Sequence, residues 1–413
     1  MYSYYLVLGL LLIIFLYKLL LLILELNSSK RGVPENLSDI YSESEFNKWN
    51  VYHNKKIRLR IIELVTKYLI LLLLLGLKVY SLVSKLFGSD LFSQTIGVIL
   101  LSIIVDEVVG AIFKYINTMK IDKEYGISVM TNKLFIIDEI KGLIIGFILS
   151  FGIVMAYAGL HYYLGDWIIL VFSILLIIIV LVVSLFLPTL MKVYYRCDDL
   201  EEGELRTKLE NLLNKHGYQV RKIGVMNQSK RSTTGNALFT GMGKFKTIIL
   251  FDTIMNQLTP DEIVAVFSHE LGHGKHKDTL KNYLSSIIGI VIFVLISWLI
   301  THYNNLFTSF GFDGINYGFI FIILSEVVLE LGSPLIGLIT NGISRKAEYE
   351  ADNFACSEGY GLELVSALKK LSNSNMANLN PHQLLVKLNY SHPPMSERID
   401  NILSHTDVKE ESW

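Results

Sequence analysis

Two histidines and a glutamate form the most specific chemical pattern of this 413-residue chain, in the segment His269-Glu-Leu-Gly-His273. On a helix, residues four apart lie on one face, so both imidazoles can bind one metal ion. Glu270 lies between them, where it can take a proton from a water molecule instead of binding the metal. Thr259 and Pro260 resemble a helix cap and first turn, which favours a helix through both histidines. We therefore predict a metal centre and not an ordinary buried helix.

A catalytic zinc ion usually has three protein ligands and an open fourth position for water. Downstream, Glu348 and Asp352 are four residues apart and share one helical face. Glu348 can ligate the metal, and Asp352 can accept a hydrogen bond from the free ring nitrogen of a ligand histidine. The spacing alone fits an exposed charged helix face equally well, because neighbouring charged residues belong to the same face.

The composition indicates a protein with many membrane spans, since 52% of the residues are hydrophobic and only 18% are charged. Seven apolar stretches are long enough to cross a bilayer. They cover about residues 4–24, 61–83, 96–115, 142–164, 167–191, 283–302 and 317–339. The soluble stretch between the fifth and sixth contains a predicted helix at 205–216 and predicted strands at 220–225 and 247–250. We divide the chain into residues 1–191, 192–281, 282–340 and 341–413.

The distribution of charge predicts the orientation and excludes one class of partner. Lys and Arg residues concentrate in alternate loops, which places the N-terminus outside and the metal helix in the cytosol. The net charge of −1, without a basic stripe, gives no indication of nucleic-acid binding. Some acidic residues lie inside the apolar stretches, where they face either a hydrated interior or a local partner. These residues are Asp106, Glu107, Glu326 and Glu330.

Four separated segments resemble the integral-membrane zinc endopeptidases of the type I CAAX prenyl protease family. They are His269-Glu-Leu-Gly-His273, Ser344-Arg-x-x-Glu-Tyr-x-Ala-Asp352, Lys230-Arg-Ser-x-x-x-Asn-Ala-x-Phe-x-Gly241 and Tyr390-Ser-His-Pro-Pro-x-x-Glu-Arg398. The resemblance implies a mainly α-helical, polytopic fold whose seven transmembrane helices enclose a water-filled chamber. It also implies a cytosol-facing zinc metalloprotease domain with a small β-sheet. One Zn²⁺ per chain would be bound by His269, His273 and Glu348, with Asp352 behind the ligands.

The resemblance also implies roles for residues outside the metal motif. His392 and Arg398 would stabilise the oxyanion of the reaction, although His392 by itself is an ordinary turn histidine before two prolines. An open strand edge would hold the substrate peptide, although this segment alone fits a simple hairpin. The residues of that edge are Asn236, Ala237, Leu238 and Phe239. Gly274 stands where the family usually has Trp, and Asp278 where it usually has His, so the shape of the pocket stays open.

These observations predict a membrane-embedded zinc endopeptidase that removes the last three residues after a prenylated cysteine. One alternative is a quality-control protease that cuts membrane-associated peptides without a lipid requirement. A second alternative is a channel or scaffold with a structural metal, which would have no need of Glu270. The expected partners are a peptide or prenylated protein C-terminus and the lipid bilayer, and a monomer is compatible with the sequence. The expected location is the endoplasmic reticulum membrane in a eukaryote, or the plasma membrane in a bacterium.

Overall fold

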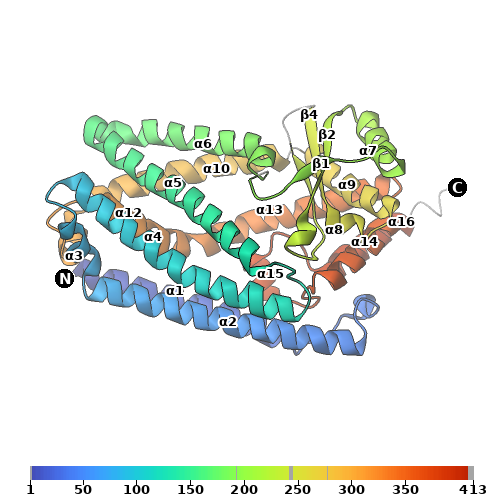
Figure 1. Cartoon of the computed structure of the whole chain (residues 1–413), viewed down its shortest axis with the longest axis horizontal. Coiled ribbons are helices and arrows are strands. Elements are labelled where there is room, and N and C mark those ends of the chain that lie inside the picture. Colours follow the sequence, from blue (N-terminus) through green and yellow to red (C-terminus); the bar gives the residue numbers. More distant parts are fainter. Residues whose placement is uncertain (1, 192, 241–244, 277, 408–413) are drawn as a thin grey trace.

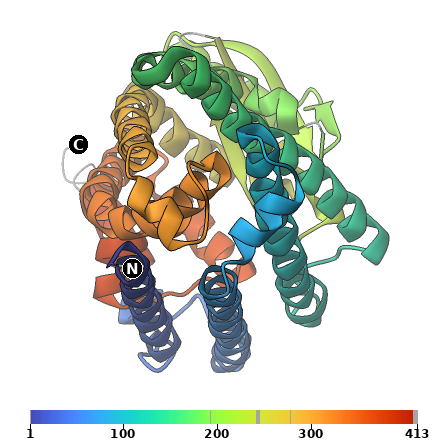
Figure 2. The same ribbon diagram turned by 90° about the vertical axis from the view of Figure 1, so that its left-hand side faces the viewer.

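The computed structural model describes residues 2–191, 193–240, 245–276 and 278–407. Long helices form one part of the molecule, and a small sheet with shorter helices forms the other (Figure 1). Seen from the end at which the N-terminus lies, the long helices are distributed around the periphery of the bundle (Figure 2). The mainly α-helical class and the small sheet are therefore confirmed.

The long helices match the predicted apolar stretches in position. They are α1 (Tyr2–Ser28), α2 (Glu43–Gly76), α3 (Val79–Leu86), α4 (Leu91–Tyr115), α5 (Asn132–Leu164), α6 (Ile168–Met191), α10 (Asp278–Thr301) and α13 (Glu330–Ser357). By length and composition, five helical segments of the described chain can cross a membrane, or six if the bent pair α2 and α3 forms one span. One of the five is the 56-residue segment Asn132–Leu187, which contains α5 and most of α6. These two helices contact each other and run back from the turn at Gly165–Trp167 in diverging directions (Figure 1), so this segment folds back on itself.

The second predicted stretch, residues 61–83, is not one continuous helix. Its helix starts earlier, at Glu43, because Ser42 and Glu45 form a capping box at the N-terminus of α2. The chain then breaks at Lys78, whose φ of 55° is left-handed, and α3 continues at an angle of 63° to α2. A left-handed residue cannot continue a right-handed helix, which explains the break.

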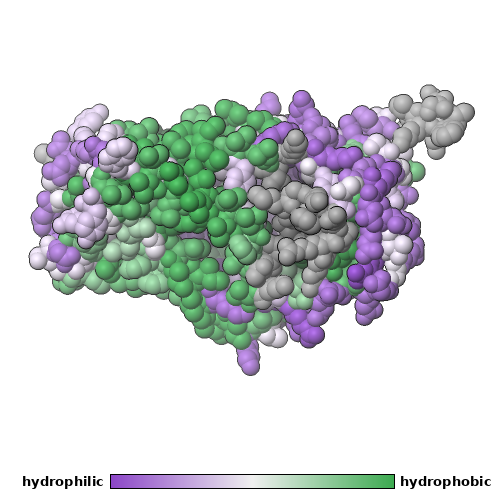
Figure 3. Space-filling view, turned by 90° about the horizontal axis from the view of Figure 1, so that it is seen from above, coloured by the Kyte–Doolittle hydropathy of each residue, from purple (hydrophilic) through white to green (hydrophobic). Residues whose placement is uncertain are grey.

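In the view of Figure 3, apolar side chains cover the middle of the molecule, over the long helices, whereas hydrophilic side chains gather at the far end of these helices and around the part with the sheet. This division is typical of a protein whose helical part lies in lipid. One of the acidic residues within the apolar stretches has a local partner, because Glu330 Oε1 lies 2.7 Å from Lys18 Nζ of α1. For Glu330, the local-pairing alternative therefore applies.

The sheet has the strand order β1-β2-β4-β3 and lies beside the predicted metal helix. Its strands are β1 (Cys197–Asp199), β2 (Gln219–Met226), β3 (Ala237–Thr240) and β4 (Phe245–Phe251), with β2 parallel to β4 and both other pairs antiparallel. The predicted strands correspond to β2 and β4, and the predicted amphipathic helix is α7 (Glu204–Lys215). Buried side chains of α7, the sheet and α9 (Pro260–Lys275) form one hydrophobic core. This core holds the metal helix against the sheet.

Two of the proposed boundaries fall inside continuous helices. Residues 340 and 341 both belong to α13, and residues 281 and 282 both belong to α10. The short helices α14 (Gly361–Ser374), α15 (Gln383–Asn389) and α16 (Met395–Asp407) follow α13 and pack against it. The helix with the predicted third ligand is thus the direct extension of a membrane span.

Candidate metal centre and active site

The helix α9 carries both histidines and begins as the sequence predicts. Thr259 and Glu262 form a capping box, and Pro260 is the first helical residue. Gly272 faces α13 so closely that a Cβ atom at this position would lie 2.9 Å from the Cα of Ala351. The absent side chain therefore permits the close approach of α9 and α13, which brings the two halves of the site together.

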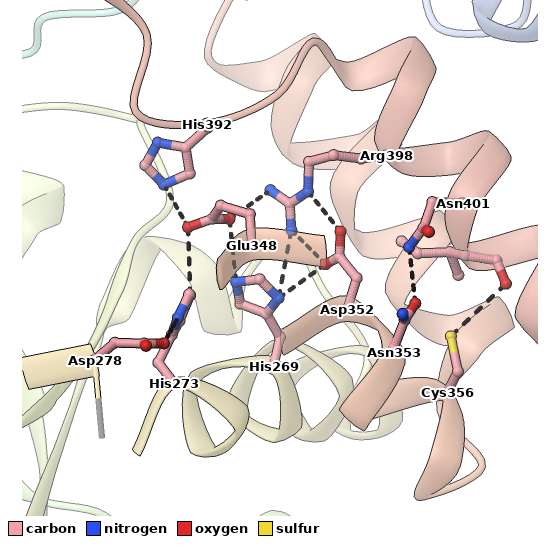
Figure 4. A network of polar contacts seen from close by, with 11 residues as sticks. His269, His273, Asp278, Glu348, Asp352, Asn353, Cys356, His392, Arg398 and Asn401 are labelled. Carbon is pink, nitrogen blue, oxygen red and sulfur yellow. Dashed lines mark hydrogen bonds and ion pairs between the residues drawn. The ribbon is translucent and has the colours of Figure 1, made fainter. Parts of the chain in front are cut away.

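Three side chains converge on one point between α9 and α13 (Figure 4). His269 Nε2 lies 3.5 Å from Glu348 Oε2, and His273 Nε2 lies 3.3 Å from Glu348 Oε1. One ligand atom from each residue falls within 4.8 Å of the other two, a spacing that can hold a metal ion. Two nitrogens and one carboxylate form the ligand set of many catalytic zinc sites. Glu348 Oε2 is buried and accepts no hydrogen bond from the described residues, so a metal ion would satisfy it.

A carboxylate and a guanidinium group lie behind the first histidine. His269 Nδ1 donates a hydrogen bond to Asp352 Oδ1 at 2.8 Å, which leaves Nε2 free for a metal. Arg398 holds Asp352 through two bonds, Nε to Oδ2 at 2.9 Å and Nη2 to Oδ1 at 2.6 Å. The Nη1 atom of Arg398 also lies 3.5 Å from Glu348 Oε2. Arg398 is thus near the site, but its guanidinium group is occupied by the residues behind the ligands.

Asp278 occupies the equivalent position behind the second histidine. Its Oδ2 atom accepts a hydrogen bond from His273 Nδ1 at 3.1 Å, and Lys281 Nζ donates to its Oδ1 atom at 2.8 Å. The spacing does not predict this role, because Asp278 lies five residues after His273 and would leave the ligand face of a continuous helix. α9 ends at Lys275 and α10 begins at Asp278, so the break returns the carboxylate to the histidine. An acidic residue closely following a ligand histidine was the available signal.

These contacts change the proton affinity of both histidines. Burial alone would lower the pKa of His269, but hydrogen bonds to Asp352 and Glu348 outweigh burial and raise this pKa to about 9. Burial also opposes the charge on His273, and its contacts with Glu348 and Asp278 raise the pKa above the ordinary value. Without a metal, both imidazoles therefore hold a proton more strongly than an ordinary histidine does, and a metal ion must compete with that proton.

Removal of the Asp278 side chain is expected to weaken zinc binding. In an Asp278→Ala variant, His273 loses the partner that fixes its ring, and loss of such a partner usually lowers metal affinity by about 10- to 100-fold. Competition with a chromophoric chelator measures the affinity, and an Asp261→Ala variant on the exposed start of α9 serves as the control. An unchanged affinity in Asp278→Ala would show that the hydrogen bond has no part in metal binding.

The other two predicted catalytic residues lie near the same centre. Glu270 is half-buried on α9 between the ligand histidines, and its carboxylate has no hydrogen bond or ion pair within the described part of the chain. His392 Nε2 lies 3.3 Å from Glu348 Oε1, while 63% of the His392 side chain remains exposed. Ser391 Oγ lies 2.9 Å from the other ring nitrogen of His392. Both residues are thus accessible to a substrate.

The predicted peptide-binding segment lies at the edge of the sheet. β3 pairs only with β4 among the described strands, in a register that places Leu238 opposite Ile249. β3 also contacts α9, so its backbone runs beside the metal helix. Asn236 is exposed before this strand, and its Oδ1 atom accepts a hydrogen bond from the backbone of Ala237 at 2.8 Å. The side chains of Leu238 and Phe239 lie outside the described part of the structure.

A candidate metal site with a free carboxylate, joined to helices that can cross a bilayer, defines an integral-membrane metalloprotease. Comparisons with known proteins agree with this class. The model of Peptidase family M48 matches residues 199–406, and a model described as "CAAX prenyl protease N-terminal, five membrane helices" matches residues 5–192. The chain therefore belongs to peptidase family M48 and is a metalloprotease of the CAAX prenyl protease type.

Individual relatives support the same assignment, and one solved structure has the same fold. The chain is 33% identical to the "CAAX prenyl protease 1 homolog" of Arabidopsis thaliana over 70% of this chain and 68% of the relative. It is 30% identical to the "Probable CAAX prenyl protease 1" of Schizosaccharomyces pombe over 78% of this chain and 66% of the relative. The chain therefore spans about two thirds of the length of each of these two relatives. The fold matches "Crystal Structure of S. mikatae Ste24p" with a TM-score of 0.89 at 23% identity, over 97% of this chain and 99% of that one.

Proposed function

We propose that the protein is a zinc endopeptidase that removes the last three residues after a prenylated cysteine, acting at the cytosolic face of its membrane. The convergence of His269, His273 and Glu348 beside an open strand edge is the observation that carries this proposal. The two relatives described above are named as CAAX prenyl proteases, which supports the choice of substrate. The zinc assignment is supported by the ligand set of two histidines and one glutamate.

In the proposed reaction, each residue has one task. His269, His273 and Glu348 hold the zinc ion, which supplies activation of water and of the scissile carbonyl when bound. Glu270 takes the proton from the attacking water and passes it to the leaving amine. His392 donates to the carbonyl oxygen as negative charge develops on it. Arg398 supports the stabilisation of this negative charge indirectly, because its contacts with Asp352 and Glu348 hold both carboxylates in place.

The substrate peptide is proposed to extend the sheet at β3. Backbone groups at an unpaired strand edge bind an extended peptide with little demand on its side chains. Asn236 and the backbone of Ala237, Leu238 and Phe239 would hold the peptide, and the contact of β3 with α9 would place its scissile bond near Glu270. Selectivity for a prenyl group must then come from a different part of the protein.

The decisive experiment compares farnesylated and unmodified peptides of identical sequence with the purified protein. A prenyl-specific protease should cleave the farnesylated peptide much faster, with a single product cut after the cysteine, as determined by mass spectrometry. Equal rates for the two peptides would instead support a quality-control protease with the same chemistry. No cleavage of either peptide by the zinc-loaded protein would contradict the proposed activity.

A His392→Ala variant is expected to lose about 10²-fold or more in turnover, because one oxyanion donor usually contributes this much. Zinc content and peptide affinity should change little, since His392 is exposed and lies outside the group of three ligands. Metal analysis and turnover are measured on one preparation. Loss of zinc would make His392 a ligand or a support for one, and full activity would make the turn before Pro393 purely structural.

The topology is part of the proposal. Counting α5 and α6 as separate passes, and α2 with α3 as one, gives the seven spans that the sequence predicts. With the N-terminus outside, Asn27 is expected in the cytosol and Asn305 on the opposite side. Single cysteines at these positions, in a background where Cys197 and Cys356 are replaced, are labelled with an impermeant maleimide in sealed vesicles. The reverse labelling pattern would contradict the orientation.

A further inference from the structure

A cavity of about 440 Å³ lies outside the metal centre, between α13, α15 and the start of α16. Three cationic side chains line it: Arg345 and Lys346 on α13, and Lys387 on α15. The acidic residue in its lining is Glu397, which accepts a hydrogen bond from Tyr349 Oη at 2.9 Å. The lining therefore has an excess of positive charge, and its single carboxylate already has a partner.

Close packing and hydrogen bonds between α13 and α15 fix the walls of this cavity. A Cβ atom at Gly337 would lie 2.7 Å from the backbone oxygen of Leu388, so the two helices approach closely. Asn341 Nδ2 donates to the same oxygen at 2.7 Å. Arg345 Nη1 donates to the backbone oxygens of Val386 and Tyr390, both at 2.8 Å. Arg345 thus satisfies the carbonyl groups at the C-terminal end of α15 and fixes that helix on α13.

The two lysines contribute positive charge to the cavity, and they are not needed for the packing of α15 on α13. Lys346 is exposed, and its Nζ atom lies 3.9 Å from Glu350, at the limit of an ion pair. Lys387 is also exposed, and no carboxylate of the described ranges forms an ion pair with it. Two ammonium groups are therefore available to a ligand with negative charge.

The position of the cavity along α13 indicates the source of that ligand. The helix exposes apolar side chains as far as Ile343, two residues before Arg345, and charged residues follow from Arg345 onward. The exposed apolar residues are Leu335, Ile336, Leu338, Ile339 and Ile343. Such a change from apolar to basic residues marks the level at which acyl chains meet headgroups. A lipid whose chains lie along α13 would place its phosphate at the cavity.

We propose that this cavity binds the headgroup of an anionic phospholipid, with Lys346 and Lys387 contacting the phosphate and α13 contacting the acyl chains. Arg345 contributes long-range positive charge while it holds α15. The lipid site adjoins the segment of α13 that carries Glu348, but it shares no residue with the group of three metal ligands.

The test measures lipid binding to the full-length protein in neutral detergent by native mass spectrometry. Phosphatidylglycerol is expected to bind one high-affinity site more tightly than phosphatidylcholine. In the double variant Lys346→Gln and Lys387→Gln, phosphatidylglycerol binding should weaken by roughly thirtyfold, the usual effect of two lysines at an anionic surface. Binding of phosphatidylcholine should stay unchanged. Equal binding of phosphatidylglycerol by the wild type and the double variant, or equal binding of both lipids by the wild type, would overturn the proposal.

Two controls separate the remaining explanations. The double variant Lys30→Gln and Lys133→Gln removes the same charge from exposed positions outside the cavity and should bind phosphatidylglycerol like the wild type. Equal weakening in this control would mean a general charge effect and would overturn the site. Inorganic phosphate is the third probe: displacement of the lipid by millimolar phosphate would indicate a free-anion site instead. Unfolding temperatures establish whether the variants are folded. If the double variant is not folded, lipid binding is measured for each single lysine variant instead.

Discussion

A Glu270→Gln variant is expected to lose about 10² to 10⁴ in turnover while it retains its zinc and its fold, because a general base contributes this much to the rate. Glu270 lies on α9 between His269 and His273, yet it is not one of the three residues that can hold the metal. Its carboxylate has no partner among the residues that the structure describes, and it is half-buried beside the centre. Glutamine preserves the shape of this side chain and removes the ability to accept a proton.

The measurement combines single-turnover cleavage, metal analysis and thermal unfolding on one preparation of the variant. Stoichiometric zinc and an unchanged unfolding temperature, together with the loss of rate, would assign the effect to the chemical step. Wild-type turnover would refute the proposed hydrolytic mechanism. Loss of zinc would show that Glu270 acts on the metal site and not on the proton.

The Glu348→Gln variant is expected to fail at an earlier stage, because it should not retain zinc at all. Glu348 is the only anionic ligand of the proposed set, and both ligand histidines approach its two oxygens. Its loss should lower zinc affinity by more than the roughly 10- to 100-fold that is typical of a residue behind the ligands. Arg398 keeps its two bonds to Asp352 in this variant, so the chain should stay folded.

Chelator competition and metal analysis after size-exclusion chromatography measure this effect, and turnover should be absent without added zinc. The matched control is Glu350→Gln, the same chemical change two residues further along α13. Glu350 lies 3.9 Å from Lys346 and from His276 and takes no part in the ligand set. Stoichiometric zinc in Glu348→Gln would show that the third ligand is a different residue.

The metal helix was predictable because its signals are local. The i, i+4 spacing of the histidines, the cap at Thr259 and the proline after it all depend on a few consecutive residues. The role of Glu348 was left undecided by its spacing, since a helical face alone does not reveal its partner. In the structure Glu348 lies beside both histidines, because the missing side chain of Gly272 allows α9 and α13 to approach.

Other features depend on contacts that a sequence does not display. The break at Lys78 and the return of Asp278 to His273 both arise where a helix ends, and helix ends are poorly specified by apolar periodicity. Arg398 was recognised only through the family resemblance, because 46 residues separate it from Asp352, to which it binds. Long-range ion pairs of this kind leave no pattern in a single sequence.

The helical segment that can cross the bilayer also carries Glu348, so we expect the thickness of the membrane to influence the geometry of the candidate site. α13 runs from Glu330 to Ser357, with lipid-facing side chains in one half and Glu348 in the other. A span whose apolar length differs from the local hydrocarbon thickness responds by tilting. Because α9 packs directly on α13 at Gly272, we expect a tilt of α13 to change the distances between Glu348 and both histidines. Hydrophobic mismatch thus becomes a catalytic variable, and one enzyme should turn over at different rates in thin and thick bilayers.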